Sequence, residues 1–350
     1  MTRRGAAARC TLATGRVEET KMAMDAHAAE DLEALRVPLT GYCYRLLGSA
    51  ADTDDAVQET LIRASSKWDL FDPSRGRVST WVHRIATNVC LDMLRSARRR
   101  ELVVDVEAAA GRGPGLGAPL PARAWVEPMP DARLVASRDP GDVVLERESV
   151  RLAFIAALQH LAPRQRAVLI LRDVLAFTAR ETAEVLDTTT ASVNSALQRA
   201  RAVLDEHRPD PFDVDDPADP AQRDLLRRYV RAFETHDVAE LTAVLRADAV
   251  STMPPFLWRL DGGPAIASLL GVGGECAGAR LVPCDVNGAR GFGQYRPDDD
   301  GLLHPFALVT VEIRGGLIAR TVAFLGTAGR FGEFGLPAVL RREDLLLRDR

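Results

Sequence analysis

The chain has 350 residues, a length that favours two or three domains over one, and its 47% hydrophobic content is enough for packed cores. No apolar run approaches the roughly 20 residues that span a bilayer, so no membrane partner is expected. Five cysteines without a C-x-x-C pair argue against a disulfide framework and a zinc site, favour a reducing cytoplasm, and give no reason to expect a cofactor.

The net charge of −4 hides two segments of opposite sign. Arg84 to Arg100 contains five arginines against one acid, Asp92, whereas Pro209 to Pro220 contains five aspartates and no base. Because local charge decides what a surface attracts, the acidic total does not exclude a nucleic-acid partner.

An Ala-, Arg- and Thr-rich stretch opens the chain and predicts a disordered leader over 1–27. Apolar residues at helical spacing then predict a helix from Asp31 to Leu47, which Gly48 and Ser49 end. The next helix begins with acids and an amide: Asp52, Asp54, Asp55, Gln58 and Glu59. Acids in a first turn stabilise the helix dipole, but four within eight residues exceed that need. They predict a docking face for a basic partner protein.

A third helix is predicted from Ser79, with Arg84, Asn88 and Arg95 outside its apolar stripe and Arg98 to Arg100 at its end. A basic run at a helix end can simply be a solvated cap. An exposed face that carries Arg and Asn is also typical of a surface for nucleic acid. The second basic segment, described below, favours nucleic acid.

Residues 105–141 are rich in Ala, Gly and Pro and predict a flexible linker, because such a composition buries too little surface to fold alone. A second helical domain is predicted over 142–207, and Phe177 to Leu204 in it follows the pattern of a helix-turn-helix. Val193, Leu197 and Ala200 form the buried stripe of its second helix. The side chains predicted to face DNA are Thr190, Ser192, Asn194, Ser195, Gln198, Arg199 and Arg201. Such groups read base edges and hold phosphates, although a solvated helical hairpin is the alternative.

An acidic, proline-rich linker is predicted over 208–220, an α+β domain over 221–340 and a tail over 341–350. Two helices, from Leu225 and from Val238, precede strand-like runs between Ala249 and Leu325. Arg314 to Leu317 predicts a tight hairpin around Gly315 and Gly316.

Three stretches together resemble the extracytoplasmic-function (ECF) group of the sigma-70 family: Asp52 to Ala64 (DTDDAVQETLIRA), Trp81 to Arg95 (WVHRIATNVCLDMLR) and the helix-turn-helix. The resemblance implies a first sigma domain over 28–104, which binds the polymerase clamp and opens the −10 element. It implies a second sigma domain over 142–207, which reads the −35 element. The acids of the second helix would face the clamp, and Arg84, Asn88 and Arg95 would lie along DNA near the melted region.

The C-terminal part resembles a SnoaL-like domain, a polyketide-cyclase relative, in Tyr229 to Asp237 (YVRAFETHD), Met253 to Pro255 and the closing strands. The expected architecture is therefore two all-α sigma domains followed by an α+β cone with a curved antiparallel sheet. A cyclase needs a positioned acid/base pair. His236, Asp285 and His304 are the candidates, but a fold does not fix a function and no enzyme is expected.

We therefore expect a sigma factor whose C-terminal domain modulates its activity. The implied partners are core RNA polymerase, through its clamp and flap, and promoter DNA. An anti-sigma factor or a small ligand at the C-terminal domain is a further partner that the resemblance allows. The alternative function is a helix-turn-helix regulator fused to a ligand-binding or cyclase-like domain. That alternative assigns no function to Asp31 to Arg100.

Overall fold

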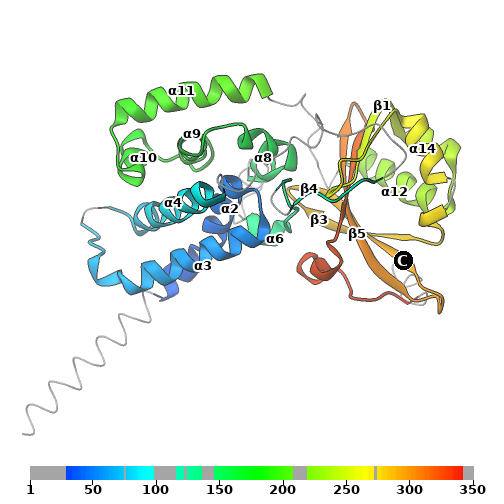
Figure 1. Cartoon of the computed structure of the whole chain (residues 1–350), viewed down its shortest axis with the longest axis horizontal. Coiled ribbons are helices and arrows are strands. Elements are labelled where there is room, and N and C mark those ends of the chain that lie inside the picture. Colours follow the sequence, from blue (N-terminus) through cyan, green and yellow to red (C-terminus); the bar gives the residue numbers. More distant parts are fainter. Residues whose placement is uncertain are drawn as a thin grey trace, which may run out of the picture.

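The computed structural model describes residues 29–74, 76–97, 116–121, 124–135, 146–207, 219–271 and 274–341. A helical lobe lies beside a lobe built on one sheet (Figure 1). The predicted leader, Arg98 to Arg100, residues 105–115, 122–123 and 136–141 of the first linker, residues 208–218 of the second and the tail from 342 fall outside this part of the chain. Among the residues described, no helix combines the length and hydropathy that crossing a bilayer requires.

The first domain contains the helices α2 (Arg36–Leu47), α3 (Ala50–Ser66) and α4 (Val78–Ala97), with a 3-10 turn η1 (Trp68–Leu70) after α3. Gly48 ends α2 in the left-handed region with φ 71°. The Ser49 hydroxyl accepts a hydrogen bond from the Asp52 N–H at 3.3 Å and so caps α3. The predicted break at Gly48 and Ser49 is therefore confirmed, with a mechanism for each side of it.

The second helical domain contains α8 (Leu152–Gln159), α9 (Pro163–Leu169), a π-helical turn η2 (Ile170–Val174), α10 (Ala179–Leu186) and α11 (Thr190–His207). Thr178 and Glu181 form a capping box at the start of α10. Asp187 adopts φ 50° at its end, and the Thr189 hydroxyl accepts from the Ser192 N–H at 3.1 Å. These contacts fix the predicted helix-turn-helix as α10 and α11.

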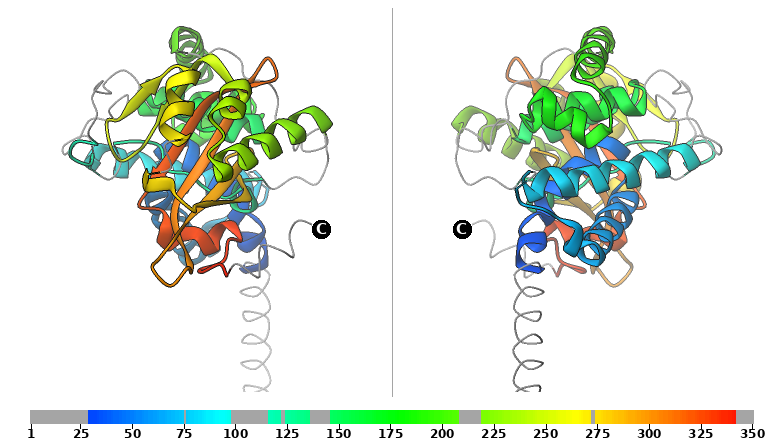
Figure 2. Two further views of the ribbon diagram at one scale, coloured as in Figure 1. Left: turned by 90° about the vertical axis from the view of Figure 1, so that its right-hand side faces the viewer. Right: turned by 90° about the vertical axis from the view of Figure 1, so that its left-hand side faces the viewer.

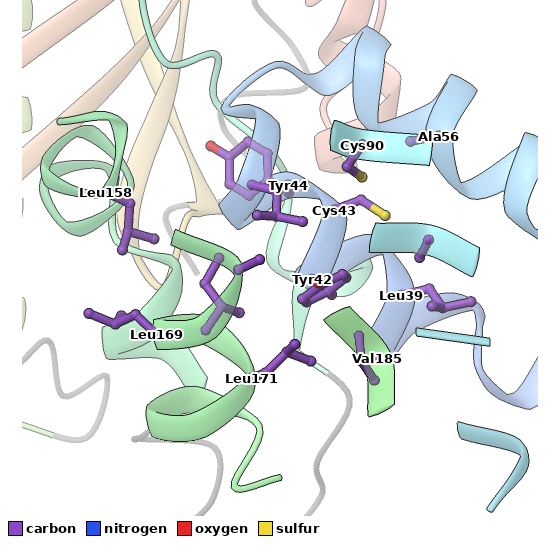
Figure 3. Packing of buried hydrophobic residues seen from close by; sticks show 14 of the residues in the cluster. Leu39, Tyr42, Cys43, Tyr44, Ala56, Cys90, Leu158, Leu169, Leu171 and Val185 are labelled. Carbon is purple, nitrogen blue, oxygen red and sulfur yellow. The ribbon is translucent and has the colours of Figure 1, made fainter. Parts of the chain in front are cut away.

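The two helical domains share one hydrophobic core. Figure 3 shows Leu39 and Tyr42 of α2 in the same cluster as Leu171 and Val185 of the second domain. Tyr42 is fully buried, and its hydroxyl lies 2.7 Å from that of Thr87 on α4. The domains are therefore packed directly on each other, which no single-domain pattern predicts.

The linker differs from the flexible segment expected over 105–141 wherever the structure describes it. Met129 is fully buried, Leu134 is buried, and a short helix α6 spans Asp131–Leu134. The Glu127 carboxylate accepts hydrogen bonds from the Ala50 N–H at 2.7 Å and the Ser49 hydroxyl at 3.0 Å. The composition of the linker does not predict this ordered structure, because contacts with distant parts of the chain, and not contacts within the linker, stabilise it.

The C-terminal domain places α12 (Pro220–Thr235), α13 (Val238–Val244) and α14 (Gly263–Gly271) against a six-stranded sheet (Figure 2). The strands are β1 (Leu245–Thr252), β2 (Arg259–Asp261), β3 (Arg280–Val286), β4 (Ala289–Pro297), β5 (Leu303–Arg314) and β6 (Leu317–Leu325), in the order β2-β1-β6-β5-β4-β3. Two 3-10 segments, η3 (Gly274–Cys276) and η4 (Ala328–Phe334), complete it.

The sheet is mixed rather than wholly antiparallel as expected, because β1 pairs in parallel with β6. The cause is topological: β1 is the first strand, and it joins the sheet beside the last one. No element is predicted between Met253 and Leu281, so β2 and α14 were missed. The tight hairpin is confirmed, with Gly315 and Gly316 at φ 60° and 72° between β5 and β6.

Each face of the sheet packs a different layer. Tyr229 and Phe233 of α12 lie in the core on the helix-covered face. The other cluster contains Tyr295, Leu308 and Phe331, with Trp125 of the linker and Leu152 of α8 packed against it. This second cluster joins the C-terminal domain to the helical lobe.

Candidate promoter-DNA and polymerase interfaces

The second helix of the helix-turn-helix exposes every side chain that the sequence assigns to its DNA face: Thr190, Ser192, Asn194, Ser195, Gln198, Arg199 and Arg201. Val193, Leu197 and Ala200 are buried on the opposite side. α11 thus presents one continuous polar face outward, as a helix in a major groove does.

The two arginines of this face have different partners. Arg199 donates to the Ser195 hydroxyl at 2.6 Å, a neutral neighbour one turn away. Arg201 makes two hydrogen bonds to the Asp173 carboxylate, at 2.9 and 2.7 Å. A bidentate ion pair has to be broken before a guanidinium can turn to a phosphate or a base. Arg199 is therefore better placed than Arg201 to contact DNA.

Helix α4 also exposes the residues predicted for promoter DNA. Arg84, Asn88 and Arg95 are exposed, and Arg95 pairs with Asp92 at 2.7 Å. At the start of the helix Trp81 packs with Trp68 and Phe71, with ring centroids 6.1 and 5.4 Å away. This aromatic cluster holds the loop before α4 against the helix, so Trp81 has a packing role.

The acidic residues of α3 differ in their exposure to solvent. Asp54, Asp55 and Gln58 are exposed, and Glu59 pairs with Arg63 at 2.7 Å. Asp52 is different: it is buried in the first turn, beside the Ser49 cap. A helix places successive residues 100° apart, so a run of acids cannot share one exposed side. Asp52 is therefore not part of the exposed face to which the sequence assigned it.

Helix α4 and the helix-turn-helix lie against each other in this structure. Arg77, just before α4, forms an ion pair with Glu181 of α10, and Arg84 lies 3.9 Å from Asp187 in the turn. The buried His83 ring meets the Phe177 ring at 5.2 Å. The Arg77 guanidinium, together with hydrogen bonds from Thr178, lowers the pKa of Glu181 to about 2, so this carboxylate is charged at neutral pH.

Sequence reasoning missed Arg77, His83, Phe177 and Glu181 as contact residues. Taken alone, each has an ordinary local setting. Arg77 lies in a loop and His83 is buried on α4, while Phe177 precedes the cap of α10 and Glu181 is the acid of its capping box. No local signal could have paired them, because 104 residues separate Arg77 from Glu181.

The candidate acid/base residues of the C-terminal domain lie apart. Asp285 pairs with Arg290 at 2.9 Å, and its strand partner on β4 is the same residue. His304 is opposite Arg296, six residues further along β4, which corresponds to roughly 20 Å. His304 instead lies 2.8 Å from Asp298, whose carboxyl pKa it lowers.

His236 is the third candidate, and it ends α12 in the left-handed region, with Nδ1 3.2 Å from the Leu270 carbonyl oxygen. Within the described part of the chain, the three residues thus form no acid/base pair.

Known proteins resemble this chain in sequence and in fold. The family model for Sigma-70 region 2 matches residues 25–100, and that for Sigma-70, region 4 matches residues 151–204. The ECF RNA polymerase sigma factor SigG of Mycobacterium tuberculosis is 41% identical over 313 residues, which cover 87% of this chain and 82% of that one. SigJ of the same organism is 30% identical over 222 residues, 63% of each chain.

The crystal structure of M. tuberculosis SigJ matches with a TM-score of 0.58 and 24% identity, over 88% of this chain and 100% of that one. That likeness extends the shared fold beyond the two helical domains into the α+β domain. The SigG likeness covers most of both chains. The chain belongs to the extracytoplasmic-function group of the sigma-70 family and is a sigma factor, which binds core RNA polymerase and directs promoter recognition and transcription initiation.

Proposed function

We propose that the free sigma factor is closed, and that its C-terminal domain modulates activity by favouring this closed arrangement over the promoter-ready one. The observation that carries the proposal is the direct contact between α4 and the helix-turn-helix. The −10 and −35 elements are separated by about 25 base pairs, which is about 85 Å of duplex at 3.4 Å per pair. Two units in contact cannot reach both elements, so they must separate before initiation.

The residue roles follow from this proposal. Asp54, Asp55, Gln58 and Glu59 face the polymerase clamp. Arg84, Asn88 and Arg95 contact DNA near the melted region once α10 has moved away. The exposed face of α11 reads the −35 element. In the closed arrangement Arg84 is directed to an acid, Asp187, and separation exchanges that acid for phosphate.

The C-terminal domain is suited to bias this equilibrium because it contacts both the linker and the second helical domain. A tethered domain acts at high effective concentration, so it needs no separate inhibitor. A ligand can shift the balance only by binding one arrangement more tightly than the other. Sigma factors are not enzymes, and the separated positions of Asp285 and His304 favour regulation over catalysis.

A distance measurement tests closure. Spin labels at Asn88→Cys on α4, one turn from Arg84, and Ala191→Cys at the start of α11, in a chain whose Cys10 and Cys276 are changed to Ser, report on the separation of the two units. We expect a short distance in the free chain and a distance several tens of ångströms longer in the complex with core polymerase. The control pair, Ser96→Cys with Lys67→Cys, lies within the first domain and should not change. An equally long distance in both states would refute closure.

A further inference from the structure

One arginine of the linker connects the C-terminal domain to the polymerase-docking face. Arg133, on α6, forms an ion pair with Asp54 of α3. Its other guanidinium nitrogen lies 3.3 Å from the Glu333 carboxylate of η4. The Arg133 side chain is 29% exposed and that of Asp54 is 53% exposed. Arg133 thus covers, from within the chain, one of the acids that the clamp would contact.

The β3–β4 turn of the C-terminal domain fixes the start of α6. Asn287 adopts φ 52° there and is 1% exposed. Its side-chain oxygen accepts from the Met129 N–H at 2.8 Å, and its own N–H donates to the Met129 carbonyl at 3.0 Å. The next N–H, of Gly288, donates to the Asp131 carboxylate at 2.7 Å, and Asp131 is the first residue of α6. The turn therefore sets where α6, and with it Arg133, can lie.

The same carboxamide contacts both helical domains. Its NH2 group donates to the Tyr44 hydroxyl of α2 and to the Val150 carbonyl, both at 2.8 Å. A Cβ at Gly288 would lie 2.3 Å from the Arg147 carbonyl oxygen, so the turn fits this place only with a glycine. Because Tyr44, Met129 and Val150 belong to three different segments, the turn binds them only when they lie together. Docking of the turn and closure of the helical lobe are therefore coupled.

We propose that the docked C-terminal domain and core RNA polymerase compete for Asp54: the β3–β4 turn and Glu333 hold Arg133 over this acid in the free chain, and the clamp has to displace Arg133. The inference rests on the proposed function. Asp55 and Gln58 stay exposed in the closed chain, so polymerase can make its first contacts there before Arg133 leaves. The buried hydrogen bonds of Asn287 should hold the closed arrangement more strongly than the Arg133 ion pair does, because each buried donor or acceptor left unpaired costs free energy.

Affinity of the full chain for core polymerase tests the competition. Arg133→Ala should bind about two- to fivefold more tightly than wild type, since a partly exposed ion pair no longer has to be broken. The gain should vanish in the Asp54→Asn background, because the two side chains act on each other. Asn287→Gly keeps a residue that accepts φ 52° and removes the carboxamide, and it should tighten binding about fivefold or more.

Arg36→Ala is the matched control, because it removes an arginine that pairs with Glu33 rather than with an acid of α3, and it should leave the affinity unchanged. Unchanged affinity of both Arg133→Ala and Asn287→Gly, in a chain that the spin labels report as closed, overturns the competition and leaves closure intact. Tighter binding of Arg133→Ala in a chain that the labels report as open supports the competition and refutes closure. An equal gain of Arg133→Ala with and without Asp54 overturns the assignment to Asp54.

Discussion

Reversing Asp54 and Asp55 to Lys should weaken binding to core RNA polymerase by at least about 100-fold. Placing like charges opposite each other at an interface costs several kcal/mol, and about 2.8 kcal/mol corresponds to this factor. Both side chains are exposed on α3, and Asp54 pairs with Arg133 of the linker rather than with the core of the first domain. The variant should therefore keep its helical content and lose its partner. Equilibrium binding of the fluorescently labelled full chain to core enzyme measures the loss.

Asp299 and Asp300 supply the matched control for this reversal. They are adjacent, exposed and acidic, but they lie in the β4–β5 loop of the C-terminal domain. Changing both to Lys produces the same change in net charge without touching α3, and affinity should stay within about twofold of wild type. If both double variants lose polymerase equally, the effect is one of total charge and the α3 docking face is refuted.

Promoter binding should depend on Arg199 far more than on Arg201. A side chain that reads a base edge contributes roughly 1–3 kcal/mol, so Arg199→Ala should weaken binding about 5- to 150-fold. Arg201 is already held by two hydrogen bonds to Asp173, and Arg201→Ala should cost less than about threefold. The measurement is a competition between wild-type and variant holoenzyme for a promoter fragment.

The two variants are each other's control, because both remove one exposed arginine from the same helix. Base reading by Arg199 should also relax sequence preference at one position of the −35 element, whereas a phosphate contact weakens all sequences alike. Equal losses for Arg199→Ala and Arg201→Ala, uniform over all sequences, would mean that α11 holds DNA without reading it through this residue.

Much of this architecture is contained in local patterns. The break at Gly48 and Ser49 and the hairpin glycines each depend on neighbours within a few residues, and each lies where the sequence predicts it. The exposed face of α11 follows from helical periodicity alone. Such features need no knowledge of the rest of the chain.

The closed arrangement could not be predicted, because its contacts join residues far apart in sequence. Asn287 and Tyr44 are separated by 243 positions, and no composition or spacing marks either as an interface residue. The prediction of a flexible linker was wrong for the same reason, since Met129 is buried by other segments. The assignment of Asp52 to the docking face was wrong because a run of acids suggests one surface, whereas the geometry of a helix turns one of them inward.

Transcription by the chain truncated after Arg208 is the most direct test of the central claim, that the C-terminal domain holds the sigma factor closed. The assay compares full-length and truncated chains at limiting core polymerase on the same promoter. We predict a transcript level roughly tenfold higher for the truncated chain, with unchanged start sites, because the closed state no longer competes with the open one. Transcript levels equal to or below those of the full chain, at equal amounts of folded protein, would contradict the account.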